Sequence, residues 1–285
     1  MIAGMTYYEM AGYFLVYSFL GWCLEVIYQA VKRGKVINRG FLCGPVCPVY
    51  GFGVLTVFML TRSHLAERLG LTEASLAQGK DLESILLLYV FGVLLATTVE
   101  LLAGWLLDVL FHARWWDYSN EPFNFHGYIC LRFSLIWGAV ILLVVLVLQP
   151  AIEMDSRLKI PQPVGWAVLA VCYAIMALDL LVTVMIVAGF NKQLSELDKL
   201  QHELKLVSDG LSQKLGNDTL KVQKDVNKVK DQAELKRHDL QIRINEKKKE
   251  LENSHAFFGP KRLLEAFPEI KHRDYQTTLN DLHQV

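Results

Sequence analysis

The chain has 285 residues, of which 53% are hydrophobic, and its 29 basic and 29 acidic side chains give a formal net charge of zero. That balance excludes the basic excess expected of a nucleic-acid-binding protein, so no nucleic-acid partner is expected. Apolar residues are concentrated before residue 190 and charged residues after it, which is typical of a membrane domain followed by a polar tail. The five cysteines fall in apolar stretches and favour packing rather than a disulfide framework.

Five stretches are long and apolar enough to cross a bilayer, for which about 20 residues suffice. They are predicted at about 8–31, 40–61, 84–111, 129–148 and 165–190. The first lacks the basic start and the cleavage site of a signal peptide. The sequence therefore predicts an all-α polytopic membrane protein, with a lipid-embedded transmembrane domain over residues 1–190.

Two pairs of these spans share similar sequence segments. The segment Gly21-Trp22-Cys23-Leu24-Glu25-Val26 recurs as Gly104-Trp105-Leu106-Leu107-Asp108-Val109, and Gly40-Phe41-Leu42-Cys43 recurs as Gly127-Tyr128-Ile129-Cys130. The offset between the copies drifts only from 83 to 87 residues. We interpret residues 8–61 and 84–148 as a tandem two-helix repeat, which the fifth span at 165–190 follows.

The distribution of basic residues predicts the orientation in the membrane. If the N-terminus is outside, the inner side receives the basic-rich tail and Lys32, Arg33, Lys35, Arg39 and Arg114, as the positive-inside rule requires. We therefore expect a multi-pass protein of the cell membrane with its C-terminal tail in the cytoplasm.

The tail changes character over residues 191–254, where apolar residues return at spacings of three and four. One stripe runs from Leu197 to Leu211 and a second from Val222 to Leu251, with Gly210 and Gly216 between them. Two helices joined by a tight turn are slightly favoured, and one long coiled coil with a stutter is the alternative. Either arrangement predicts that residues 194–251 form a homo-oligomer or bind a helical partner, while residues 255–285 form a short C-terminal segment.

Charged residues within the spans are the candidates for function, because a carboxylate in a bilayer costs about 2.5–3.5 kcal/mol. The predicted substrate- or ion-binding residues are Glu25, Arg39, Glu100, Asp108 and Arg132. All of them except Glu100 gather toward the cytoplasmic end of the repeat helices, and Glu100 is expected about 12 Å deeper than Asp108. A polar cavity reaching Glu100 would bind a proton, a cation or a polar solute. The alternative is a pair of structural ion pairs, Glu25 with Arg39 and Asp108 with Arg132, that hold the two hairpins together.

Supporting positions surround these charges. They are Trp22, Asn38, Trp105, Trp116, Asp117, Asn124, His126 and Asp179. The aromatic residues of the second loop fit either an interfacial belt or a substrate-facing lip. Asp179 either joins the site or hydrogen-bonds Thr183 or a neighbouring helix. Pro45 and Pro48 predict a kinked or broken second span. No metal site is expected, because Cys43 and Cys47 lack the paired ligands of a zinc motif.

Several long motifs resemble a known family. They are Gly21-Trp22-x-x-Glu25, Asn38-Arg39-Gly40-Phe41-Leu42-x-Gly44-Pro45, Trp115-Trp116-Asp117-Tyr118-Ser119 and Pro122-Phe123-Asn124. Over roughly residues 13–150 the chain resembles the bacterial polytopic membrane proteins of the CmpB type, which are classed as ABC-transporter permeases. The resemblance implies a transport component, and a separate ATPase subunit would be required because the chain has no Gly-x-x-x-x-Gly-Lys-Ser/Thr phosphate loop.

Two functions therefore remain open. The first is a transport protein, or a permease subunit, for a small polar or ionic solute bound at a charged intramembrane site. The second is a non-transporting membrane scaffold or regulator whose tail recruits a partner. An enzyme is not expected, because the sequence shows no nucleophile with an evident histidine base, and neither is a cofactor.

Overall fold

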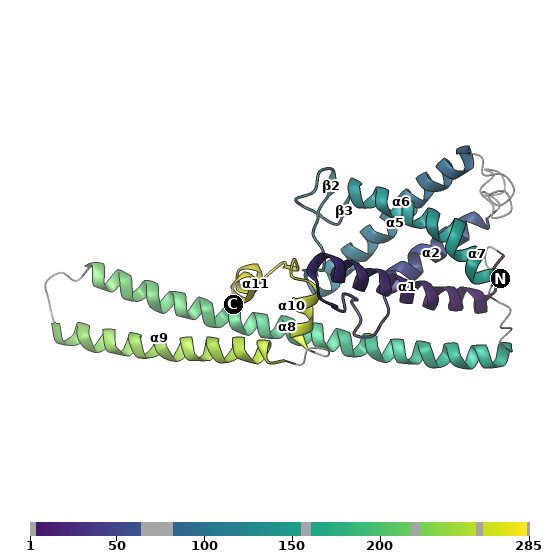
Figure 1. Ribbon diagram of the computed structural model, residues 1–285. Coiled ribbons are helices and arrows are strands. Elements are labelled where there is room, and N and C mark those ends of the chain that lie inside the picture. Colours follow the sequence, from purple (N-terminus) through teal and green to yellow (C-terminus); the bar gives the residue numbers. More distant parts are fainter. Residues whose placement is uncertain (1–3, 64–81, 155–160, 218–222, 255–258, 284–285) are drawn as a thin grey trace. The chain divides into compact units, whose positions relative to one another are not determined.

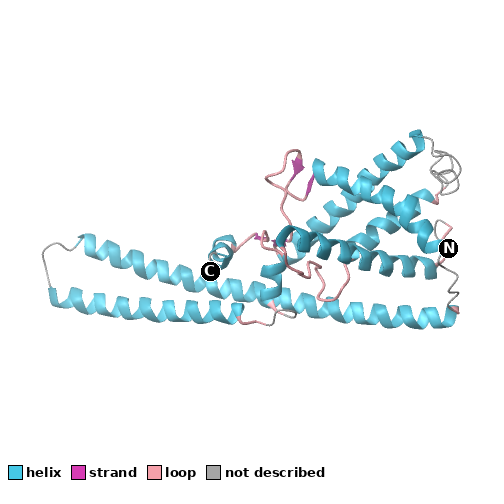
Figure 2. Cartoon of the chain, viewed as in Figure 1, coloured by secondary structure: helices cyan, strands magenta, loops and turns pink. Residues whose placement is uncertain are grey.

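The computed structural model describes residues 4–63, 82–154, 161–217, 223–254 and 259–283 (Figure 1). Most of these residues are helical, and the strands among them are two residues long (Figure 2). The predicted all-α class is therefore confirmed. The chain forms two compact units, Met1–Thr183 and Val184–Val285, and each is described by itself.

The first hairpin of the membrane unit consists of α1 (Tyr7–Arg33) and α2 (Pro48–Thr61). A capping box formed by Thr6 and Glu9 starts α1, and Gly34 ends it in the left-handed conformation. The predicted second span of 40–61 is helical only from Pro48, which occupies the first turn of α2. Residues 40–47 form a loop instead, and Pro45 is compatible with that loop because its backbone has no N–H to donate.

The second hairpin consists of α5 (Leu82–Phe111) and α6 (Leu131–Leu143), and α6 continues as a π-helix, η1 (Val144–Leu148), and then as α7 (Gln149–Met154). Between α5 and α6 lie β1 (Ala113–Arg114), β2 (Asn124–Phe125) and β3 (Ile129–Cys130). Strands β2 and β3 pair antiparallel.

An apolar core joins the two hairpins of the membrane unit. Its buried members include Tyr17, Val54, Val57, Phe58, Leu88, Ile141, Val144 and Val145. Glycines allow the helices to approach, since a Cβ on Gly138 would lie 2.4 Å from Val93 and one on Gly21 would lie 2.2 Å from Tyr50. Other large apolar side chains, such as Leu102 and Val171, remain exposed and suit a lipid environment.

Four helical segments of the described chain are long and apolar enough to cross a membrane: α1, α5, Leu131–Glu153, and Gln162–Gly210 within α8. The 14-residue α2 is about 21 Å long, shorter than the roughly 30 Å hydrocarbon core. The protein is thus a multi-pass membrane protein, and its described residues contain four candidate full-length spans and one shorter apolar helix.

The second unit begins within α8 (Gln162–Asn217), a helix of 56 residues that runs unbroken through Gly210. The chain then reverses, and α9 (Gln223–Glu252) lies antiparallel beside the charged part of α8 (Figure 1). Lys247 and Glu196 join the two helices at 2.6 Å. The tail is therefore a helical hairpin, and its predicted turn at 216–219 lies partly outside the described residues.

The C-terminal segment packs on this helical hairpin. It contains α10 (Pro260–Ala266), β4 (Lys271–His272) and α11 (Gln276–His283). Leu263, Phe267 and Leu279 are buried, and the Thr278 hydroxyl donates to Asp198 of α8 at 2.9 Å. These residues therefore belong to the folded tail unit.

Candidate functional site

Glu25 lies two turns before the end of α1 and contacts both other parts of the first hairpin. Its Oε1 accepts a hydrogen bond from the Tyr50 hydroxyl of α2 at 2.7 Å. Its Oε2 lies 3.6 Å from Nη1 of Arg39, which belongs to the loop between the helices. The predicted ion pair of Glu25 with Arg39 is thus present, and about a quarter of each side chain is exposed.

The loop that carries Arg39 is held by its neighbour Asn38. The Asn38 carbonyl oxygen accepts from the Trp22 indole N–H at 2.8 Å, and its amide donates to the Cys43 carbonyl at 2.6 Å. Trp22 and Asn38, both predicted as supporting residues, therefore fix the loop that positions Arg39. The segment gains these bonds from side chains in place of helical backbone bonds.

Asp179 of α8 holds the same loop from the other side. Its two carboxylate oxygens accept from the backbone N–H groups of Cys43, at 3.0 Å, and Gly44, at 2.8 Å. Any Cβ on Gly44 would come within 2.9 Å of Asp179, so the glycine permits this approach. The Thr183 hydroxyl lies 3.4 Å from Asp179, which is a weak form of the predicted contact.

Asp108, near the end of α5, has partners that differ from those predicted. Its Oδ2 accepts from the Tyr128 hydroxyl and lies 3.1 Å from Nε of Arg114. The predicted pair of Asp108 with Arg132 is wrong, because Arg132 contacts Glu121 at 3.4 Å. His112 adopts a positive φ of 54° directly after the helix, which turns Arg114 back toward Asp108. Burial and the Asp108 contact raise the pKa of the Tyr128 hydroxyl.

Glu100 is a buried acid of α5 with few partners among the described residues. Only 9% of the residue is exposed, and its Oε1 accepts from the Tyr118 hydroxyl at 3.0 Å. Its Oε2 has no hydrogen-bond partner among the described residues. The indole N–H of Trp137 is likewise buried without a partner of normal geometry, although it lies close to the Glu100 carboxyl. Within the described chain, no basic side chain forms an ion pair with Glu100.

The two hairpins bring Glu25 and Glu100 into one cluster. The two carboxyl groups are close enough to interact electrostatically, and the ring of Tyr50 contacts that of Trp137 edge-on at 5.5 Å between centroids. We call Glu25, Tyr50, Glu100, Tyr118 and Trp137 the acid cluster. The predicted site did not include its three aromatic members, although Tyr50 and Trp137 occupy equivalent positions of the sequence repeat, each directly before a glycine.

A second polar group, also missed from the sequence, joins α1 to α7. The buried hydroxyl of Tyr17 donates to Gln149 at 2.7 Å, and Gln149 donates to Glu153 at 2.7 Å. Glu153 also pairs with Arg62 at 3.0 Å and accepts from Tyr13 at 3.3 Å. We call these five residues the distal network, because Tyr17 precedes Glu25 by eight residues, about 12 Å along α1.

The other supporting residues form the loop between α5 and α6. Trp116 donates its indole N–H to a backbone carbonyl at 2.8 Å, and Asp117 accepts from the next serine's backbone N–H at 3.2 Å. Asn124 donates to a backbone carbonyl at 2.8 Å. The carbonyl of His126 accepts from Arg114 at 2.9 Å. Trp105, by contrast, is half exposed. Trp116, Asp117, Asn124 and His126 therefore hold the geometry of the loop. Neither these four residues nor Trp105 lies in the acid cluster.

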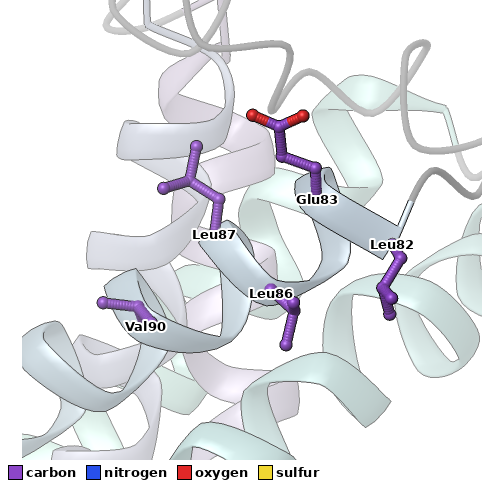
Figure 3. A pocket seen from close by; sticks show the side chains of 5 residues that line it. All are labelled: Leu82, Glu83, Leu86, Leu87 and Val90. Atoms are coloured by element: carbon purple, nitrogen blue, oxygen red, sulfur yellow. The ribbon is translucent and has the colours of Figure 1, made fainter.

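A surface hollow of about 570 Å³ lies at the start of α5 (Figure 3). Four apolar side chains and one acid line it: Leu82, Glu83, Leu86, Leu87 and Val90. Glu83 precedes Glu100 by 17 residues, about 25 Å along the helix. The hollow is therefore separate from the acid cluster, and its apolar lining suits lipid.

Comparison with known proteins identifies the family. No curated protein and no solved structure matches the chain. A family model described as "Putative ABC-transporter type IV" matches residues 12–184, which is more than half of the 285 residues. The match contains the whole acid cluster and the distal network. The resemblance read from the sequence motifs is thus confirmed, and the chain belongs to this ABC-transporter type IV family of CmpB-type membrane proteins.

Proposed function

We propose that this protein is a transport component that binds a proton or a small cationic solute at the acid cluster. The observation that carries the proposal is Glu100, whose buried carboxyl has one oxygen without a partner among the described residues and interacts electrostatically with the Glu25 carboxyl. A buried carboxylate without a cation is costly. A bound proton or cation would offset this cost, so the arrangement fits a site that binds and releases a positive charge.

The charges of the acid cluster favour a cation. Glu25 and Glu100 together carry two negative charges when ionised, and Arg39, paired with Glu25, supplies one positive charge. One further positive charge would neutralise the group. The hydroxyl groups of Tyr50 and Tyr118 add oxygen atoms beside the carboxylates, and hard cations prefer oxygen ligands.

The position of the acid cluster suits alternating access. It lies between the two helical hairpins, where relative motion would change access to Glu100, as in transporters with sites between repeats. Glu25 and Arg39 are partly exposed at one end, whereas the distal network ties α1 to α7 further along the helix. With the N-terminus outside, the partly exposed end would face the cytoplasm.

The energy source and the assembly belong to the same proposal. Because the chain has no phosphate loop of its own, an ABC-type mechanism requires a separate ATPase subunit. The tail hairpin over residues 194–251 is the surface we assign to that partner or to a second copy of the chain. No enzymatic activity and no cofactor are part of this proposal.

Trp137 provides an intrinsic test, because it lies beside Glu100 and contacts Tyr50. We expect the tryptophan emission of the purified protein to change saturably with pH or with one of Li⁺, Na⁺, K⁺ or methylammonium. Glu100→Gln and Trp137→Phe should each abolish the change, and Glu153→Gln should retain it as the matched control. An emission change that persists in Glu100→Gln would contradict the site, as would the absence of any change in the native protein.

A scaffold or regulator is the second candidate. It is favoured by α8, which runs without interruption from the membrane unit into the tail, and by the pairing of Glu25 with Arg39 and of Asp108 with Arg114. Paired charges can be purely structural. The fluorescence test separates the two candidates, because a scaffold has no reason to bind a cation at Glu100.

A further inference from the structure

A group of basic side chains surrounds the end of α1. Lys32 and Arg33 form its last turn, Gly34 ends the helix, and Lys35 and Arg39 follow in the loop. The Lys32 ammonium lies 5.7 Å, and the Arg39 guanidinium 5.9 Å, from the ring centroid of Tyr28. Two cationic groups therefore converge on one aromatic ring.

These positive charges exceed the acids beside them. Arg39 pairs with Glu25, but Lys32, Arg33 and Lys35 form no ion pair with any residue of the described chain. The carbonyl groups at a helix C-terminus carry only about half a negative charge. Roughly two to three positive charges thus remain for a ligand.

Exposed apolar residues accompany the charges. Val31 and Val36 are each more than four-fifths exposed, and Ile27, one turn before Val31, is also exposed. Tyr28 offers a partly exposed ring with a polar tip, as is usual at a membrane interface. The surface is therefore apolar toward the middle of the span and cationic at its end.

We propose that Tyr28, Lys32, Arg33 and Lys35 bind the headgroup phosphate of an anionic phospholipid, with an acyl chain against Ile27 and Val31. Clusters of basic residues at the end of a membrane helix attract anionic lipids. A soluble phosphate would use the charges but not the exposed valine and isoleucine, so the surface fits a lipid better. This inference does not depend on the proposed transport function.

The test measures the thermal unfolding of the purified full-length protein in neutral detergent micelles. Phosphatidylglycerol should raise the unfolding temperature saturably, whereas phosphatidylcholine and inorganic phosphate should not. The double variant Lys32→Gln/Lys35→Gln should need about 25-fold more phosphatidylglycerol for the same shift, at about fivefold for each charge removed. Both side chains are exposed, so the variant should fold.

Arg132→Gln is the matched control. Arg132 is an exposed cation near an aromatic ring at the start of α6, but it pairs with Glu121. It should leave the phosphatidylglycerol response unchanged, and native mass spectrometry should count fewer retained phosphatidylglycerol molecules only in the double variant. The proposal is overturned if phosphatidylcholine or phosphate acts as phosphatidylglycerol does, or if the double variant responds like the native protein.

Discussion

The acid cluster and the distal network both join α1 to the second half of the membrane unit, and both place tyrosine hydroxyls beside a glutamate. They differ in how that glutamate is satisfied. Glu153 of the distal network contacts Arg62, Gln149 and Tyr13. Glu100 of the acid cluster has only the Tyr118 hydroxyl at one oxygen, and its other oxygen has no partner among the described residues.

Burial makes this difference informative. The side chain of Glu153 is 43% exposed and contacts Arg62, Gln149 and Tyr13, whereas the whole Glu100 residue is 9% exposed and accepts one hydrogen bond of normal geometry, from Tyr118. Selection for stability alone would favour the opposite arrangement, because an unpartnered polar atom is most costly where water is absent. The distal network therefore has the properties of a structural contact, and the acid cluster those of a site that needs a ligand.

Gln149→Leu should produce the largest loss of stability. The substitution removes the acceptor of the buried Tyr17 hydroxyl and a donor to Glu153. Leaving such groups unsatisfied should lower the free energy of unfolding by about 3 kcal/mol. Equilibrium unfolding in mixed micelles measures the change. A loss below about 1 kcal/mol would show that the distal network does not hold the hairpins together.

Asp108→Asn should cause the second-largest loss and lower the free energy of unfolding by about 2 kcal/mol. It removes the charge that pairs with Arg114, and about a third of the Arg114 side chain is exposed, so the cost is below that of a fully buried pair. The same unfolding measurement should find Arg132→Gln nearly neutral, because its contact with Glu121 is exposed. The reverse order of these two variants would restore the pairing predicted from the sequence.

The pairing of Asp108 illustrates what the sequence could not provide. Helix periodicity placed Asp108 near the end of a long apolar helix, and the structure agrees. The identity of its partner depended on the positive φ of His112, a conformation that is uncommon in residues other than glycine and that the sequence did not predict. Arg114 was therefore passed over in favour of Arg132, which lies at the start of an apolar span and is easier to notice.

The acid cluster was partly predictable for a related reason. Glu25 and Glu100 stand out because charges are rare in apolar helices. Counting residues placed Glu100 about 12 Å deeper than Asp108, so the interaction of Glu100 with Glu25 was not predicted. Tyr50 and Trp137 occupy equivalent positions of the sequence repeat, but only the packing of the two hairpins shows that these rings and Tyr118 contact the two acids. The short α2 was overestimated for a local reason, since residues 40–47 are apolar but gain their backbone bonds from Asn38 and Asp179.

Glu153→Gln should lower the free energy of unfolding by about 0.5–1 kcal/mol, which is less than Gln149→Leu or Asp108→Asn. The neutral amide keeps its size and can still accept hydrogen bonds, but the ion pair with Arg62 is lost, and partly exposed pairs contribute little. High salt should weaken the pair in the native protein and leave the variant unchanged. A salt-independent loss above about 2 kcal/mol would mean that this carboxylate is a buried charge in the bilayer.

Glu100→Gln makes the same chemical change in the acid cluster and should alter the free energy of unfolding least, by less than about 0.5 kcal/mol. Tyr118 can still donate to the amide oxygen, and no ion pair is broken, because Glu100 forms none within the described chain. Removing an unpaired charge from an apolar environment offsets whatever hydrogen bonding is lost. The Trp137 emission response, by contrast, should disappear.

The two glutamine variants are therefore expected to have opposite effects on stability and on the Trp137 emission response. Glu153→Gln should lower stability and keep the emission response, whereas Glu100→Gln should keep stability and lose the response. If Glu100→Gln destabilised the protein as much as Glu153→Gln did and left the emission response intact, Glu100 would be a structural residue. The unpartnered oxygen at Glu100 would then need a different explanation, such as a bound water that stabilises one fixed arrangement of the hairpins.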